Sequence, residues 1–370
     1  MARRRALSGS RVMAKVTRIL IAFLQGAPLR PYERSYVAML TEELQKNQDR
    51  IRFVIEEQPS RADIIILLES AEYKTVEYLH ILENDPLIRK HADRVYTINY
   101  DDHPEGMLAG LYTSLEEPFF DPEIHRIWPV LFLNNPLVYG VTRADICRSR
   151  PSRLFSFTGA ESHAVRRRLF ALFSEASSDR RVERVAKWYN HDDGDRRHFV
   201  NVALDSMFSL CPRGFTSYTH RIPEIMALSR VPVIIADNWI PFSFEHELPY
   251  YIRVPETDIE YLADILSLRR DEAEQYGRNA RMVWEKHCSE QRRAVAAVEC
   301  IASMVARRQG VSYAYYRELW HSKAFLLRAG WTLRQRVSLR LQQHFRRFLP
   351  SIRLPGLTLD ILERNAPNRK

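Results

Sequence analysis

The stretch that decides the fold covers residues 209–237 and reads SLCPRGFTSYTHRIPEIMALSRVPVIIAD. It predicts a strand, a polar loop, a helix and a second strand. The first apolar run ends at Pro212 and Gly214, residues that stop a strand and allow a tight turn. Residues 231–236 form a short run rich in β-branched side chains, which is typical of a buried parallel strand.

The loop of this stretch has the features of an anion site. Pro223 is tolerated in a first helical turn, and Thr219 or His220 lies where a cap is needed. A helix N-terminus presents free N–H groups and a positive dipole end. Arg213 and Arg221 add positive charge there. The sequence therefore predicts that this loop binds a negatively charged group.

Length and composition describe a globular protein of two domains. The chain has 370 residues, of which 45% are hydrophobic and 27% charged, and no apolar run approaches the roughly 20 residues of a membrane helix. The net charge of +9 favours an anionic partner, but much of the excess lies at the two ends. We therefore expect no nucleic-acid groove.

The four cysteines are far apart and show no CxxC spacing, so neither a zinc site nor a disulfide framework is predicted, and a cytoplasmic location is the simpler setting. Residues 1–15 are basic and precede the apolar run 16–24. This order resembles a signal peptide. The alternative, which we favour, is a first strand behind a basic tail.

Strands and helices alternate through residues 16–150, which predicts an α/β domain with a mainly parallel sheet. Asp101, Asp102 and His103 directly follow the strand predicted at 93–100. Ligands of such sheets bind at the carboxyl ends of strands, so these side chains are candidates for a general base. The competing interpretation is a turn with a local Asp cap.

A second alternating unit is predicted over residues 151–305. A strand at 154–158 leads through Gly159 into a helix at 162–173 that carries Arg166 and two further arginines. A glycine followed by arginines in the first helical turns can meet a phosphate, although only one or two of the three can face a ligand.

Asp193 and Asp195 have the spacing that some sugar transferases use to hold a divalent metal. Asp and Gly also form turns for local reasons, and we favour that interpretation.

The segment 306–370 is predicted to be a basic helical tail. Its apolar residues recur at spacings near three and four, with one gap of six: Leu327, Trp331, Val337, Leu341, Phe345 and Phe348. Such a helix lies on an anionic membrane surface or packs on the body of the protein, and the sequence leaves both open.

Several of these pieces together resemble the exostosin family of glycosyltransferases. They are SMFSLCPRG at 206–214, RIPE at 221–224, VPVIIAD at 231–237 and the segment 248–259. Residues 157–169 look like the start of that family's donor domain, and residues 100–112 are similar to a segment of bacterial exostosin-like proteins. The resemblance is strong over 153–265, weaker over 90–150 and absent in the tail.

The resemblance implies a GT-B architecture, in which two Rossmann-like domains face each other across a cleft and the second holds a nucleotide diphosphate sugar. We take a UDP-sugar as the expected donor, a glycan or lipid-linked saccharide as the acceptor, inversion as the outcome, and no obligatory metal. We further expect the enzyme to work in cell-surface polysaccharide synthesis, in the cytoplasm or, through its basic tail, at the inner face of the membrane. The alternative is a catalytically silent sugar-nucleotide binder with the same fold.

By the same resemblance, Glu224 binds the ribose hydroxyls and Arg221 lies beside the diphosphate, while Gly159 and Arg166 approach the phosphates from the other side. Arg213 braces the loop. The complete predicted donor site is Gly159, Arg166, Pro212, Arg213, Gly214, Ser217, Thr219, Arg221, Glu224 and Asp237. The base candidates remain Asp101, Asp102 and His103, with Glu161 a weaker one.

Overall fold

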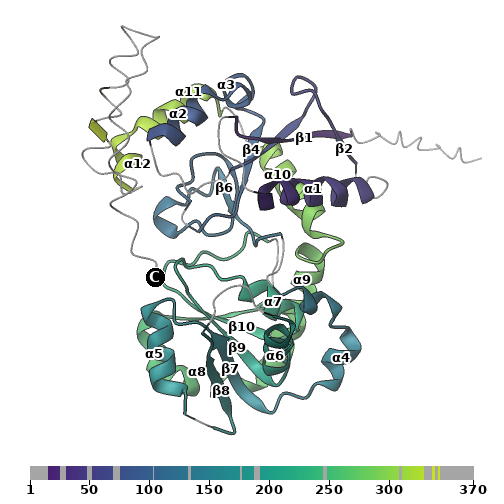
Figure 1. The fold of residues 1–370 in the computed structure, drawn as a ribbon, viewed down its shortest axis with the longest axis vertical. Helices are drawn as coiled ribbons and strands as arrows, with labels where there is room; N and C mark the ends of the chain where they lie inside the picture. Colours follow the sequence, from purple (N-terminus) through teal and green to yellow (C-terminus); the bar gives the residue numbers. More distant parts are fainter. Residues whose placement is uncertain are drawn as a thin grey trace, which may run out of the picture.

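The structure is a computed structural model, and it describes residues 16–25, 31–47, 52–69, 76–102, 104–131, 135–175, 177–186, 192–244, 248–307, 311–328, 336–337 and 341. They form two lobes, one above the other in Figure 1, each built on a parallel sheet with helices on its faces. The predicted basic tail 1–15 lies outside the described residues.

The first sheet contains six described strands in the order β2-β1-β3-β4-β5-β6, all parallel. They are β1 (Thr17–Phe23), β2 (Phe53–Ile55), β3 (Ile64–Leu68), β4 (Val95–Asn99), β5 (Gly110–Tyr112) and β6 (His125–Ile127). Gly110 adopts a φ of +152°, and a Cβ there would lie 2.1 Å from the carbonyl oxygen of Thr97. Only glycine lets β4 and β5 approach this closely.

The second sheet contains five described strands in the order β11-β10-β9-β7-β8, again all parallel. They are β7 (Arg153–Gly159), β8 (Arg180–Arg184), β9 (Ser206–Pro212), β10 (Val231–Ile235) and β11 (Ile252–Val254). Every residue of β10 is buried, as its unbroken apolar run predicts. The predicted strand-loop-helix-strand unit is thus present as β9, α7 and β10.

The described helices connect and cover the strands. The α-helices are α1 (Pro31–Lys46), α2 (Val76–Asn84), α3 (Pro86–His91), α4 (Arg143–Arg148), α5 (Ala164–Phe173), α6 (Asp193–Leu204), α7 (Arg221–Ala227), α8 (Leu262–Ser267), α9 (Ala273–His287), α10 (Arg293–Arg307), α11 (Tyr313–His321) and α12 (Lys323–Arg328). Short 3-10 turns lie at η1 (Glu117–Phe119), η2 (Pro136–Gly140), η3 (Glu256–Tyr261) and η4 (Arg270–Glu272). None of the described helices is long and apolar enough to cross a bilayer.

The three last helices return to the first lobe (Figure 1). Buried side chains of α10, α11 and α12 belong to the core under the first sheet. The indole nitrogen of Trp320 donates to the carbonyl of Met107 at 2.7 Å, and the Tyr316 hydroxyl accepts from the amide of Ala109 at 3.1 Å. The predicted domain bounds 16–150, 151–305 and 306–370 stay predictions, but packing places α10 to α12 with the first sheet.

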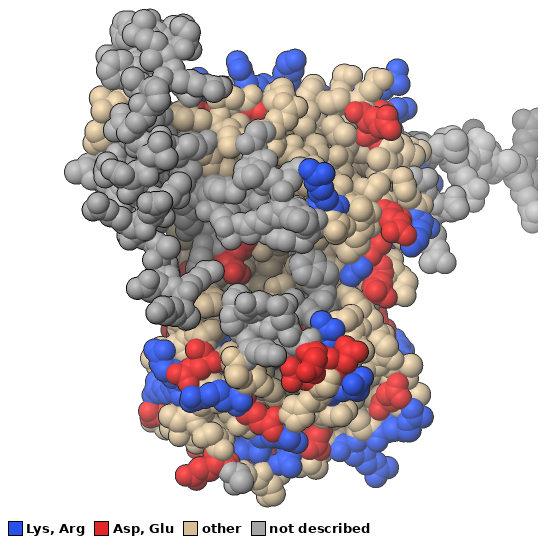
Figure 2. Space-filling view, in the orientation of Figure 1, with Lys and Arg blue, Asp and Glu red and all other residues tan. Residues whose placement is uncertain are grey.

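The two lobes share an apolar interface. One core cluster joins Tyr112, Leu115 and Ile127 of the first lobe to buried residues of α7 and β10 in the second. The backbone of Ile127 also exchanges hydrogen bonds of 2.8 and 2.9 Å with Ser243. In Figure 2 the surface is hollowed between the lobes, with acidic side chains beside the hollow. This two-lobed arrangement confirms the predicted GT-B fold.

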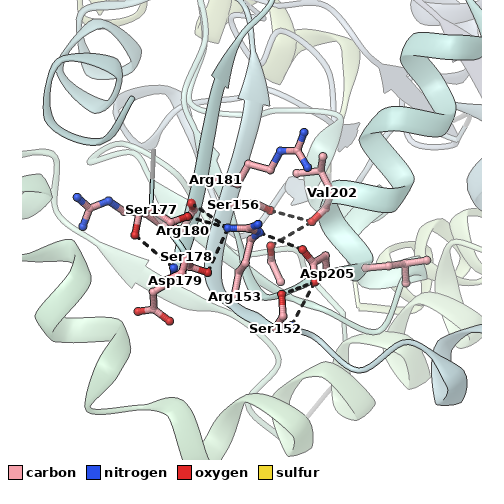
Figure 3. A network of polar contacts seen from close by, with 12 residues as sticks. Ser152, Arg153, Ser156, Ser177, Ser178, Asp179, Arg180, Arg181, Val202 and Asp205 are labelled. Atoms are coloured by element: carbon pink, nitrogen blue, oxygen red, sulfur yellow. Dashed lines mark hydrogen bonds and ion pairs between the residues drawn. The ribbon is translucent and has the colours of Figure 1, made fainter. Parts of the chain in front are cut away.

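At the amino end of β7, a network of polar contacts fastens the base of the second sheet (Figure 3). Arg153 donates to the Asp205 carboxylate at 3.0 Å and to the carbonyls of Ser177 and Ser178 at 2.8 and 3.1 Å. This network lies at the opposite end of β7 from Gly159, so it is structural support remote from the predicted donor site.

Candidate functional site

The predicted donor residues gather at the carboxyl edge of the second sheet. Gly159 ends β7 and Pro212 ends β9, and these two strands are neighbours. Their loops therefore leave the same edge side by side. A Cβ on Gly214 would lie 3.3 Å from an Arg166 nitrogen, and one on Gly159 would lie 3.2 Å from an Arg221 nitrogen. Both loops thus pack directly on arginine side chains.

Arg166 of α5 lies beneath the two loops. Its guanidinium donates to the carbonyls of Arg213 at 3.0 Å, Ala160 at 3.2 Å and Pro212 at 3.2 Å. Burial, with a smaller contribution from the charge of Arg221, lowers the pKa of Arg166 to about 9. The side chain is still a cation at neutral pH, and it fixes the shape of both loops from below.

Arg221 begins α7 and projects under β7. Its guanidinium donates to the carbonyl of Thr158 and lies 4.7 Å from the ring centre of Phe157 and 5.6 Å from that of Phe199. Its Nε is buried and has no hydrogen-bond partner, and burial lowers its pKa. In the described part of the chain, no ion pair joins Arg221 or Arg166 to a carboxylate. The charge of Glu224 acts on Arg221 and opposes the effect of burial on its pKa. Two buried neighbouring cations nevertheless favour an anionic ligand.

The start of α7 differs from the expectation in detail. Its N-cap residue is His220, whose side chain makes no cap hydrogen bond, while the Thr219 hydroxyl accepts from the amide of Arg221 at 3.4 Å. Burial lowers the pKa of His220 to about 4, so its imidazole is neutral at pH 7. Since α7 has only seven residues, attraction for an anion depends mainly on the arginines rather than on the helix dipole.

Glu224 lies one turn into α7 and is only 6% exposed. Its Oε1 accepts from the backbone amide of Asn135 at 2.8 Å, and the Asn135 side chain donates to the carbonyl of Arg196 at 2.9 Å. Glu224 thereby ties α7 to the segment that joins the two lobes. Its predicted contact with a ribose stays a prediction.

A second group of predicted donor residues contacts the first lobe. Arg213 donates to Glu116 Oε1 at 3.2 Å and lies 3.6 Å from a carboxylate oxygen of Glu256. The Ser217 hydroxyl donates to the same Glu116 oxygen at 2.7 Å. Asp237 and Glu256 exchange backbone-to-carboxylate hydrogen bonds of 3.2 and 3.0 Å. Arg213 and Ser217 therefore join this loop to the first lobe, and their part in the donor site stays a prediction.

The predicted base candidates lie at the carboxyl edge of the first sheet. Asp101 is half-buried, and its amide donates to the Asn99 side chain at 3.1 Å, while Asp102 is exposed. His103 lies outside the described residues. Their catalytic role stays a prediction. Glu161 forms an ion pair of 2.7 Å with Arg184.

Asp193 and Asp195 occupy the first turn of α6, and the amide of Asp195 donates to the capping carboxylate of Asp192 at 2.9 Å. This capping is what the turn interpretation predicts. In the part of the chain that the structure describes, no group of three His, Cys, Asp or Glu side chains could hold a metal ion.

Two carboxylates at the first sheet's edge were not predicted. Glu69 directly follows β3, is buried, and accepts from Tyr78 at 3.0 Å and Asn99 at 3.1 Å. Burial raises its pKa. Glu116 lies four residues beyond β5. Both obey the rule that selected Asp101, a carboxylate just past the carboxyl end of a strand, and that rule applied to every strand would have found them.

Comparison with known protein families gives a match over this part of the chain. Residues 114–268 match the model of the Exostosin GT47 domain, which spans the loops and helices described above. No curated protein sequence matches the chain.

Among solved structures, HepE of Anabaena in complex with UDP is 11% identical, with a TM-score of 0.41 over 79% of this chain and 100% of its own. A glycosyltransferase from Rickettsia africae is 9% identical, with a TM-score of 0.41 over 79% and 99%. These likenesses are distant, and the fold is defined by the two parallel sheets.

The two-lobed fold and the matched domain define a glycosyltransferase of the GT-B type. The match to the exostosin GT47 domain over residues 114–268 confirms the predicted resemblance to exostosin glycosyltransferases and the predicted enzyme class.

Proposed function

We propose that this enzyme transfers a sugar from a UDP-sugar to a hydroxyl group of a glycan or lipid-linked saccharide, with inversion at the anomeric carbon. The observation that carries the proposal is the pair of buried neighbouring cations Arg166 and Arg221, which donate to the carbonyls of the loops at the carboxyl edge of the second sheet. A nucleoside diphosphate supplies the missing negative charge.

The chemistry follows from where charge develops. As the bond between the sugar and the diphosphate breaks, the leaving oxygen gains negative charge, and fixed cations beside it stabilise the transition state more than the ground state. Arg221 and the loop from Pro212 to Thr219 are the groups we assign to this task, with Arg166 holding the loop in shape. Glu224 is assigned to the ribose hydroxyls.

The deciding experiment is a thermal-shift screen against UDP-, GDP- and dTDP-sugars. A ligand at 100 times its dissociation constant should stabilise the protein by about 2.7 kcal/mol. We expect the UDP series to give the largest shift, and release of UDP with an acceptor mixture then distinguishes a transferase from a silent binder. No shift with any nucleotide would refute the donor site.

We propose that catalysis needs no bound metal. Asp193 and Asp195 already serve the first turn of α6. Transfer should therefore continue in EDTA, and Asp195→Ala should retain activity; loss of activity in both cases would instead support a metal-dependent transferase.

We further propose that the enzyme acts at the inner face of the membrane in cell-surface polysaccharide synthesis. Support comes from three apolar side chains of the predicted tail helix, Leu327, Val337 and Leu341, which are 50%, 45% and 49% exposed. Because α11 and α12 belong to the first core, the test variant should keep them and end at Arg328. The truncated protein should no longer sediment with anionic vesicles, and unchanged sedimentation would refute the membrane role.

A further inference from the structure

A buried segment carries a carboxylate from the first lobe to the donor loop. After β5, the residues Thr113, Ser114 and Leu115 are all buried, and the amide of Thr113 donates to the carbonyl of Asn99 at 3.0 Å. Glu116 follows directly, at the start of the short turn η1. The backbone leading to this carboxylate is therefore held in place by the sheet.

The two carboxylate oxygens of Glu116 have different surroundings. Oε1 accepts from the Ser217 hydroxyl at 2.7 Å and from Arg213 at 3.2 Å. Oε2 accepts no hydrogen bond from the described residues, and the side chain as a whole is 23% exposed. Two donors therefore fix the orientation of the group, and its second oxygen is the one without a donor among the described residues.

We propose that Glu116 is the general base of the transfer reaction. The inference deepens the proposed function and rests on it. Inversion in one displacement requires a base on the acceptor side of the cleft, within hydrogen-bond reach of the attacking hydroxyl. Glu116 belongs to the first lobe, as an acceptor-side base must, and it already contacts two residues of the predicted donor loop, Arg213 and Ser217.

In the reaction step, the acceptor oxygen forms a bond to the anomeric carbon and its proton passes to Glu116 Oε2. The bond from that carbon to the diphosphate oxygen breaks, and its electron pair leaves with UDP. The proton on Glu116 is then released to water. Ser217 and Arg213 act as positioning residues, because their hydrogen bonds hold Oε1 and so direct Oε2.

The test compares Glu116→Gln with Glu117→Gln, a matched change at the next residue, whose side chain is exposed. The readout is release of UDP from the best UDP-sugar of the screen, with water as the acceptor. A positioned general base contributes about 10²- to 10⁴-fold, so Glu116→Gln should lower kcat by that factor and flatten the acidic limb of the pH profile. UDP affinity should change less than threefold, and Glu117→Gln should behave as the wild type.

A second variant tests the proton transfer itself. In Glu116→Ala, sodium azide should restore turnover and yield the inverted glycosyl azide, because an anionic nucleophile has no proton to lose. If Glu116→Gln proves unstable to heat, Glu116→Asp replaces it, with a smaller fall in kcat expected.

Three results would overturn the inference. The first is a rise in KM with unchanged kcat in Glu116→Gln, which would indicate a contact that only joins the lobes. The second is the absence of a glycosyl azide product from Glu116→Ala. The third is a loss of kcat in Asp101→Asn but not in Glu116→Gln. Failure of the wild type to bind UDP would instead refute the proposed function, so the two failures are distinguishable.

Discussion

Replacing Arg221 by methionine should strongly weaken the interaction with the donor and leave the fold nearly as stable as before. Methionine fills a similar volume but carries no charge. Loss of one charge-assisted contact to the leaving diphosphate costs about 2 to 4 kcal/mol, so kcat/KM should fall about 30- to 900-fold.

The stability estimate comes from opposing effects at the same side chain. The substitution removes the hydrogen bond to Thr158 and the contacts with the rings of Phe157 and Phe199, the latter worth about 0.5 to 1 kcal/mol each. Two effects of the substitution are stabilising. It removes a buried Nε that has no hydrogen-bond partner and that costs the wild type about 1 to 3 kcal/mol. It also removes the charge repulsion between Arg221 and Arg166. The net change should be within about 1 kcal/mol, and Tm should move by no more than about 4 °C.

The assay is calorimetric titration with UDP, paired with thermal unfolding. The matched control is Arg153→Met. Arg153 lies at the amino end of β7 (Figure 3), whereas Arg221 contacts the carboxyl end of that strand. Arg153 holds Asp205 and two backbone carbonyls, so the control should lose about 1 to 3 kcal/mol of stability and keep its UDP affinity. If Arg221→Met unfolds more than 8 °C early but binds UDP normally, then Arg221 is structural and the donor site is wrongly assigned.

Glu224→Gln keeps an acceptor for Asn135 but weakens ribose binding, so KM for the UDP-sugar should rise at least tenfold in initial-rate assays; an unchanged KM would leave Glu224 with a role only in joining the lobes. Burial raises the pKa of Glu83, but hydrogen bonds from His321 and His80 outweigh it and bring that pKa to about 2. This depressed pKa contributes about 3 kcal/mol above pH 4.5 that is lost as the pH falls toward 2, and urea unfolding of Glu83→Gln should show a flatter pH dependence there. In Gly277→Ala the new Cβ would lie 2.4 Å from a backbone oxygen of the neighbouring α7–β10 turn, so circular dichroism should record a loss of about 1 to 3 kcal/mol with kcat unchanged.

The sequence predicts the second lobe better than the first. Its strands end at Gly and Pro and its apolar runs match the sheet's burial, so β7, β9 and β10 follow from local signals. The sequence also singled out Arg166 and Arg221, because a cation just past a strand suggests an anion site, and that role stays a prediction. Their side-chain directions were not predictable, because Arg166 depends on three carbonyls from two loops, one of them nearly 50 residues away.

The partners of the C-terminal helices were also beyond the sequence. Periodicity identifies the apolar stripe of α10 but does not say which sheet it covers. The strand-end rule could have selected Glu116, but its contact with Ser217 in the other lobe, about 100 residues further on, was not predictable. Contacts at such separations leave no local pattern to detect.

The return of α10 to α12 to the first lobe has a consequence for biosynthesis. The ribosome completes the first sheet at β6 and then makes the whole second lobe before Tyr316 and Trp320 emerge. At about 5 to 20 residues per second, this interval lasts roughly 10 to 40 s. During that time part of the first core has no cover, whereas the described strands of the second sheet are already made. A message that stops before α11 would thus yield a complete second sheet attached to a first lobe whose core stays open.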